Sequence, residues 1–334
     1  MYVKKYSFIL LIVLFTILSC KKGRPPVPQP TSISNAQVDV YAVGYIYTDL
    51  QIYTAAYWKN GVINKLVADS SVISQANAIV VSGADVYIAG TVFGVATYWE
   101  NGIATELQGG SRSFANAIAV DNNDVYVAGA MGTSTPNSVA EYWKNGQAYR
   151  LVTDSSSFSW AYGIAVSGKD VYIAGYTTGV RGFIQATYWK NGVATVLGDS
   201  LSPSNASAIS LNGADVYIAG NIGSNNTVAA YWKNGVASIV SQPGSRASGI
   251  AVYGKDVYIA GNTGYERGAY WKNGALTNLP FFSTVLAVTV NGTDVYAAGY
   301  SDASNKPTAS YWKNGVEVQL SQNAVINGIT LVPQ

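Results

Sequence analysis

Two short motifs each recur seven times along the chain, and this repetition limits the possible folds more than any other feature. The first is Tyr-Trp-Lys/Glu-Asn-Gly, which begins at Tyr57, Tyr98, Tyr142, Tyr188, Tyr231, Tyr270 and Tyr311. The second is Asp-Val-Tyr-x-x-Gly, which begins at Asp39, Asp85, Asp124, Asp170, Asp215, Asp256 and Asp294. Copies of the first motif are 39 to 46 residues apart. Such a period is typical of propeller blades and other repeat arrays.

Each period contains four stretches with the composition of β-strands. A short apolar run and a tight turn precede Asp-Val-Tyr-x-x-Gly; a variable loop, the Tyr-Trp motif, an Asn-Gly turn and a last apolar run follow. Asn-Gly between two β-like runs is a strong hairpin signal. Tyr and Trp are adjacent and point to opposite faces of their strand, so both faces of each sheet are predicted to be buried. A blade between two neighbours in a β-propeller meets this requirement, whereas an open solenoid would need polar capping repeats.

The two ends of the chain predict how the ring closes. The apolar run at Gly328 to Leu331 has no Asp-Val-Tyr after it, and the motif at Asp39 has no complete blade before it. We expect Asn327 to Val332 to pair with Val38 to Gly44 and complete the first blade, which would remove two exposed strand edges. The predicted fold is all-β: a seven-bladed β-propeller over residues 37–334, with four antiparallel strands per blade.

The N-terminal segment has the features of a lipoprotein signal. Residues 1–19 contain two lysines and then an apolar stretch that is short for a membrane span and typical of a signal peptide. The sequence Ile17-Leu18-Ser19-Cys20 resembles a bacterial lipobox, and Cys20 is the only cysteine. The resemblance implies cleavage before Cys20 and its lipidation; an ordinary signal peptide with an incidental cysteine is the alternative. Because Lys21 rather than Asp follows, the expected location is the outer membrane, on either its periplasmic or its surface side.

Residues 20–36 contain four prolines, which predicts an extended tether between the lipid and the propeller.

Beyond residue 19 the chain carries 18 basic and 18 acidic side chains, and this balance argues against nucleic-acid binding. The chain has no histidine, which excludes Ser-His-Asp and Cys-His catalysis and His-ligated zinc. Asp121 to Asp124 lacks the oxygen spacing of a calcium-binding loop. We therefore expect no metal and no cofactor.

Carboxylate chemistry is the remaining catalytic alternative. A glycan hydrolase of this type needs two carboxylates about 5 to 9 Å apart. Seven of the 18 carboxylates are the repeat Asp, which we expect to cap backbone amides of the turn before it. The candidates outside the repeat are scattered and share no motif: Asp49, Asp69, Glu106, Glu141, Asp154, Asp199, Glu266 and Asp302. The sequence therefore predicts no catalytic residues.

Binding residues are expected on one face of the ring. Because successive strands alternate in direction, the variable connections all emerge on the same face, and loops on a rigid scaffold commonly carry binding sites. Trp160 is the one tryptophan outside the repeat; it would stack on a sugar ring, anchor a peptide or fill a gap between two blades. The candidate ligand-binding residues on these loops are Trp160, Arg112, Arg181, Arg246, Arg267, Tyr176, Tyr265 and Tyr300, with Tyr45, Tyr47, Phe93, Phe183 and Phe281 nearby.

The stretch from Ala96 to Gly129 resembles the HAF-type extracellular repeat. Its pattern of Ala-x-x-Trp-x-x-Gly, Leu-Gly-Gly, Ser-x-Ala-x-Ala-Ile and Val-x-Gly extends over Val38 to Val332, although Gly-Gly before the serine occurs only at Gly109-Gly110. The family implies a secreted or surface propeller-like domain and supplies no catalytic residues. We expect an envelope lipoprotein that binds a glycan or a protein partner, or acts as a scaffold, through the variable face. The alternatives are a carboxylate-dependent glycan hydrolase or lyase and a purely structural envelope component.

Overall fold

The computed structural model describes residues 37–48, 52–132, 138–151, 158–179, 182–199, 201–224, 226–264, 267–302 and 306–334. These residues belong to one compact unit, Ala36–Gln334, and their regular structure is entirely β. None of them belongs to a helix with the length and hydropathy of a membrane span. The predicted signal peptide, Cys20 and the whole predicted tether lie outside the described residues.

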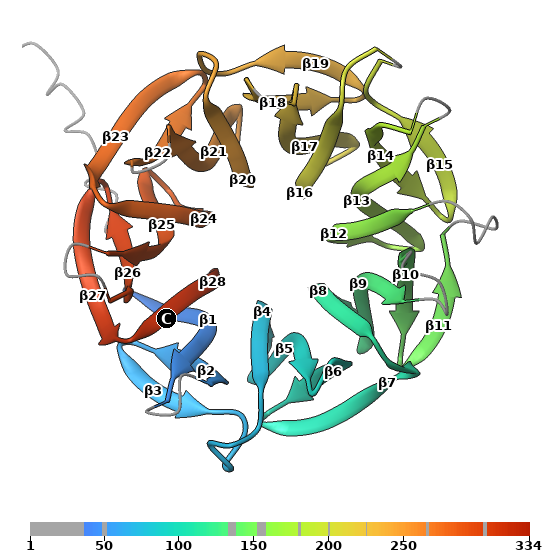
Figure 1. Ribbon diagram of the computed structural model, residues 1–334. Coiled ribbons are helices and arrows are strands. Elements are labelled where there is room, and N and C mark those ends of the chain that lie inside the picture. Colours follow the sequence, from blue (N-terminus) through green and yellow to red (C-terminus); the bar gives the residue numbers. More distant parts are fainter. Residues whose placement is uncertain are drawn as a thin grey trace, which may run out of the picture. The chain divides into compact units, whose positions relative to one another are not determined.

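The strands form seven four-stranded antiparallel sheets that are arranged as a ring (Figure 1). From blade 1 to blade 7, the innermost strands are β28 (Ala324–Pro333), β4 (Ser74–Ser82), β8 (Ser113–Asp121), β12 (Ser159–Ser167), β16 (Ser204–Asn212), β20 (Ser245–Tyr253) and β24 (Ser283–Asn291). The second strands are β1 (Val38–Tyr47), β5 (Asp85–Val92), β9 (Asp124–Gly132), β13 (Asp170–Thr178), β17 (Asp215–Ile222), β21 (Asp256–Thr263) and β25 (Asp294–Ser301).

The outer half of each blade is the Tyr-Trp hairpin. The third strands are β2 (Tyr53–Lys59), β6 (Val95–Glu100), β10 (Ser138–Lys144), β14 (Ile184–Lys190), β18 (Val228–Lys233), β22 (Arg267–Lys272) and β26 (Thr308–Lys313). The outermost strands are β3 (Val62–Lys65), β7 (Ile103–Ser111), β11 (Gln147–Arg150), β15 (Val193–Val196), β19 (Val236–Ile239), β23 (Ala275–Phe281) and β27 (Val316–Gln322). The fold is a seven-bladed β-propeller, as predicted.

The C-terminal strand closes the ring. β28 pairs with β1 in antiparallel register from Val38 opposite Pro333 to Ile46 opposite Ala324, and the N–H of Gln334 donates to the carbonyl of Gln37 at 2.9 Å. Blade 1 therefore consists of one strand from the end of the chain and three from its beginning. This confirms the closure that the incomplete first and last repeats predict.

The tryptophans of the repeat form the contacts between neighbouring blades. All seven are at most 1% exposed. Trp143 on β10 packs with Tyr87 and Leu107 of blade 2, while the adjacent Tyr142 packs on the opposite side, in the cluster that contains Trp189 of blade 4. Replacing such a buried aromatic side chain with alanine costs about 3–5 kcal/mol. Burial of both strand faces, inferred from the Tyr-Trp pair, is confirmed.

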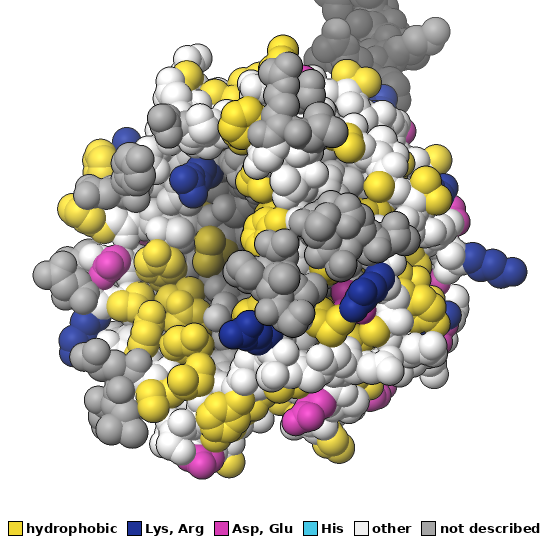
Figure 2. All heavy atoms as spheres, turned by 45° about the vertical axis from the view of Figure 1, so that its right-hand side comes forward, with side chains coloured by type: hydrophobic (Ala, Val, Ile, Leu, Met, Phe, Trp, Pro, Cys, Tyr) yellow, Lys and Arg dark blue, Asp and Glu magenta, His cyan; other side chains and the backbone are white. Residues whose placement is uncertain are grey.

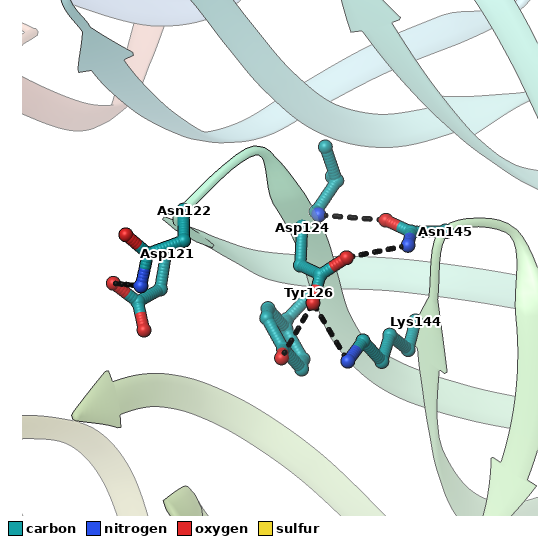
Figure 3. A network of polar contacts seen from close by, with 7 residues as sticks. Asp121, Asn122, Asp124, Tyr126, Lys144 and Asn145 are labelled. Atoms are coloured by element: carbon teal, nitrogen blue, oxygen red, sulfur yellow. Dashed lines mark hydrogen bonds and ion pairs between the residues drawn. The ribbon is translucent and has the colours of Figure 1, made fainter. Parts of the chain in front are cut away.

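A network of polar contacts ties the two motifs of each blade together, and Figure 3 shows the network of blade 3. In blade 3, the backbone N–H of Val125 donates to Oδ1 of Asn145 at 2.9 Å, and Nδ2 of Asn145 donates to Oδ1 of Asp124 at 2.8 Å. Nζ of Lys144 lies 2.7 Å from Oδ2 of Asp124 and 5.1 Å from the centre of the Tyr126 ring. The bonds from Lys144 and Asn145 hold the pKa of Asp124 below its ordinary value.

The network corrects the predicted role of the repeat Asp. The Asn of the Asn-Gly turn, not the Asp, binds the backbone amide, and it does so in all seven blades. The Asp holds that Asn and, in six blades, a Lys. In blade 2, Glu100 stands in place of the Lys and accepts from the hydroxyl of Tyr87 at 3.1 Å. The prediction failed because the two turns are distant in sequence but adjacent on one face of the ring.

Each innermost strand contains a β-bulge. One residue of each strand has no partner in the register with the second strand: Asn327, Asn77, Asn116, Tyr162, Ser207, Ser248 and Leu286 in blades 1 to 7. The glycine that ends Asp-Val-Tyr-x-x-Gly lies beside the bulge. A Cβ atom on Gly175, for example, would collide with the carbonyl oxygen of Trp160. The glycine of the repeat is therefore required by the close approach of the bulged backbone.

Candidate functional site

The two faces of the ring differ in their connections. The turns from the first to the second strand and from the third to the fourth lie on one face, which we call the constant face. Its Asn-Gly turns have positive φ at both residues, such as 51° at Asn145 and 85° at Gly146, as a type I′ turn requires. The connections on the opposite, variable-loop face range from one to eight residues in length.

A cavity of about 680 Å³ opens at the centre of the variable-loop face, and we call it the central mouth. Figure 2 shows the ring obliquely, hollowed near its centre, with apolar side chains grouped beside the hollow. The bulges place their side chains in its wall. Amide and hydroxyl groups predominate there: Gln75, Asn77, Asn116, Asn205, Ser207, Asn221, Ser224, Thr227, Ser248 and Asn327.

Asparagines at three of the bulges join neighbouring blades at the central mouth. Asn77 donates from Nδ2 to the carbonyl of Ala115 at 2.8 Å. Asn116 and Asn327 make the equivalent bonds to the carbonyls of Ala161 and Ala76, at 2.8 and 2.9 Å. Each bond crosses from one blade to the next, so the positions of the bulges are fixed relative to one another. The wall of the mouth is therefore preorganised.

Five aromatic residues of blades 3 and 4 form a group beside the central mouth, and we call them the aromatic cluster: Phe114, Phe158, Trp160, Tyr162 and Tyr176. Ring centroids are 5.1 Å apart for Phe114–Trp160, 6.2 Å for Trp160–Tyr162, 5.9 Å for Tyr162–Tyr176 and 5.7 Å for Phe158–Tyr176. Tyr162 lines the mouth and is 37% exposed.

Trp160 lies between Phe114 and Tyr162 in this cluster. It is partly buried and packs against Phe114 of the preceding blade, so it fills the junction between two blades. Its indole N–H has no hydrogen-bond partner among the described residues. The residue that presents its ring to the mouth is Tyr162, which stacks on Trp160 with an angle of 28° between the ring planes. Trp160 thus supports the exposed ring from behind.

The arginines predicted as binding residues lie in different places. Arg246 is exposed on β20 and lines the central mouth. Arg112 is exposed in the turn between β7 and β8, with φ of 68°, outside the mouth lining. Arg267 lines a separate cavity. Arg181 and Tyr265 lie outside the described residues.

The separate cavity is a groove of about 730 Å³ in blade 6. The guanidinium group of Arg267 already contacts other residues of the protein. Its carbon Cζ lies 4.4 Å from the centre of the Phe281 ring, and Nε donates to the carbonyl of Leu279 at 3.2 Å. Tyr300, another candidate, is partly buried on β25. The predicted residues therefore do not form one site: Arg246 lines the mouth, whereas Trp160 and Tyr176 belong to the aromatic cluster beside it.

The carboxylates outside the repeat do not form a site among the described residues. Asp69, Glu106, Asp199 and Asp302 are exposed, and Asp69 accepts bonds from its neighbour Ser71, which lower its pKa. Asp49, Asp154 and Glu266 lie outside the described part. The described chain contains no group of three or more acidic residues that could hold a metal ion. Glu141 is different, because it is 2% exposed and burial raises its pKa to about 7.

Sequence reasoning missed Tyr162, Phe114 and the bulge residues of the mouth. The available signal was the pattern Ser-x-Ala-x-Ala/Gly, whose second variable residue is the bulge. Without the register, simple alternation along the strand does not show that this residue faces the central channel, because a bulge re-aims the side chain.

No family model matches the sequence, and no curated protein does either. The likeness to the HAF-type repeat therefore stays a resemblance of pattern. Solved structures with similar architecture include a chain of a nidogen/laminin complex, with 10% identity and a TM-score of 0.44 over 89% of this chain and 100% of that one. A putative TolB from Agrobacterium tumefaciens has 9% identity and a TM-score of 0.48 over 90% of this chain and 99% of that one. Similarity at this level carries no inference about function.

Proposed function

We propose that the protein is a non-enzymatic, lipid-anchored binding protein of the bacterial outer membrane and that it recognises a glycan at the central mouth. The observation that carries this proposal is the combination of amide and hydroxyl groups with the exposed ring of Tyr162 in one cavity. Sugar hydroxyls are recognised by such polar groups, while an amphipathic aromatic ring suits the C–H face of a sugar. These are groups for binding rather than for bond cleavage.

The proposed anchor is compatible with an open mouth. Lipidation of Cys20 and the tether up to residue 36 rest on the sequence alone. The described chain begins beside Val38 and ends beside Pro333, which are paired at the constant-face end of blade 1. A tether joined to Gln37 would therefore leave from the constant face. The mouth would lie on the face opposite to the point of attachment.

A glycan array tests the proposal, using the chain from Thr31 to Gln334, which contains the whole compact unit. We expect binding to at least one glycan and at least a tenfold weaker interaction for Tyr162→Ala. Tyr253→Ala is the matched control, since Tyr253 is 54% exposed at the constant-face end of β20. Trp160→Ala should also weaken binding, because it removes the support of Tyr162.

Binding that survives Tyr162→Ala, or that Tyr253→Ala reduces equally, would place the site elsewhere. Absence of binding across the array would refute the glycan proposal and direct the search to protein partners by cross-linking in the envelope.

A further inference from the structure

The charge of the central mouth narrows the class of ligand. Among the described residues that line the mouth, Arg246 is the one charged side chain. The other described lining residues are neutral, and the lining of the channel below, formed by the innermost strands, contains no ionisable group except Tyr162. The mouth is therefore a neutral hydrogen-bonding surface with a single positive charge.

Arg246 also differs from the six lysines of the repeat. Six repeat lysines on the constant face each lie within 3.4 Å of an aspartate oxygen, so their charge is compensated. Arg246 lies in an open cavity, and it has no acidic partner within ion-pair distance among the described residues. A guanidinium group offers two parallel N–H donors to a carboxylate or sulfate, and such paired bonds are stronger than those between neutral groups.

The surroundings of Arg246 are held in place. Asn221 of blade 5 accepts from the N–H of Ala247 at 2.8 Å and donates to the carbonyl of the same residue at 3.3 Å, which fixes the backbone next to Arg246. Asn205 donates to the hydroxyl of Ser207 at 3.0 Å. These amides lie in blade 5, between Arg246 in blade 6 and Tyr162 in blade 4. Along the wall of the mouth, from blade 4 to blade 6, the ring of Tyr162 is thus followed by neutral polar groups and then by the cation of Arg246.

We propose that the ligand of the central mouth is an anionic saccharide, whose ring lies against Tyr162 and whose carboxylate or sulfate binds Arg246. This inference rests on the proposed glycan-binding function and specifies its ligand class. The volume of about 680 Å³ lies within the range of small-ligand sites, roughly 300–1,000 Å³. Several sugar units of an extended chain can occupy a mouth that is open to solvent. Neutral glycans lack the group that pairs with Arg246 and bind more weakly.

The test compares polysaccharides that share a backbone and differ in whether it carries anionic groups. Polygalacturonate is measured against its fully methyl-esterified form, and dextran sulfate against dextran, by surface plasmon resonance with the chain from Thr31 to Gln334. The first pair probes carboxylate and the second probes sulfate. We expect at least one anionic member to bind at least tenfold more tightly than its neutral counterpart. Arg246→Met should remove this preference, and Arg246→Lys, which keeps the charge without the paired donors, should retain part of it.

Arg112→Met is the matched control, because Arg112 is an exposed arginine of the same face outside the mouth lining. Equal binding of the anionic and neutral members would overturn the inference and leave the glycan-binding function intact. A preference for the anionic members that survives Arg246→Met would also overturn it. Failure of all four polysaccharides to bind overturns the anionic-ligand inference, and if no glycan of the array binds either, the proposed function fails with it.

Discussion

Glu141 is a buried carboxyl group whose titration should change the stability of the ring. It is 2% exposed on β10, and its Oε2 atom has no hydrogen-bond partner among the described residues. Burial raises its pKa to about 7, partly opposed by the positive charge of Arg150, its partner in the strand register. Blades 2 and 4 have Thr97 and Thr187 at this position, whose hydroxyls donate to backbone carbonyls at 3.1 and 2.9 Å.

The pKa difference between the folded and unfolded chain sets the size of the effect. Folding raises the pKa of Glu141 from an ordinary 4.5 to about 7. At about 1.4 kcal/mol per pKa unit, this shift lowers the stability of the ionised folded protein by about 3 kcal/mol. Below pH 4.5 the carboxyl is protonated in both states and has no effect on the pH dependence. Between pH 4.5 and 7 the folded state binds more protons, so its stability falls as the pH rises. Above pH 7 the whole penalty is present.

We therefore compare the unfolding free energy of Glu141→Gln with that of the unchanged chain. The difference in favour of the variant should grow by about 3 kcal/mol as the pH rises from 4.5 to 8. The assay is urea unfolding followed by tryptophan fluorescence at several pH values. The aspartates of the polar networks titrate in both proteins, so their contribution cancels in the comparison. Glu141→Thr, which copies blades 2 and 4, adds a cavity cost at every pH but should show the same pH-dependent gain. A difference between variant and parent that does not change with pH would show that Glu141 is not held protonated by burial.

Two further predictions concern the backbone. Gly175→Ala should destabilise the fold by about 1–3 kcal/mol or more, since the added methyl group meets the carbonyl oxygen of Trp160; Gly213→Ala, with open space but a φ of 59°, should cost less in the same urea assay. Equal losses for the two variants would contradict the role assigned to the bulge. Deleting residues 324–334 removes β28 and leaves an edge of β1 unpaired, so we expect loss of cooperative unfolding and association of chains in size-exclusion chromatography. A monomer that still unfolds cooperatively would show that closure is dispensable.

The two repeated motifs made the architecture predictable, because they mark the second and third strands of every blade. The incomplete ends at Asp39 and Gly328 also predicted the closing pair. The role of the repeat Asp was not predictable in the same way, because it depends on which turns meet on one face, as Asp124 and Asn145 do.

The candidate site was predictable only in part. Loop position led to Trp160 and Arg246, both of which lie at or beside the central mouth. Loop position also predicted Arg267 as a binding residue, but that side chain packs on Phe281 in another cavity. Tyr162 was missed because it is a bulge residue, and one extra residue in a strand changes the direction of its side chain in a way that composition does not reveal.

The closing pair also sets the order in which the protein can be completed. β1 is the first described strand that a ribosome makes and β28 is the last, yet they are direct neighbours in blade 1. Blades 2 to 7 are each built from one continuous stretch and can form as the chain emerges. Blade 1 has no innermost strand until the final ten or so residues are available. The fold of blade 1 can therefore be completed only after β28 has been synthesised.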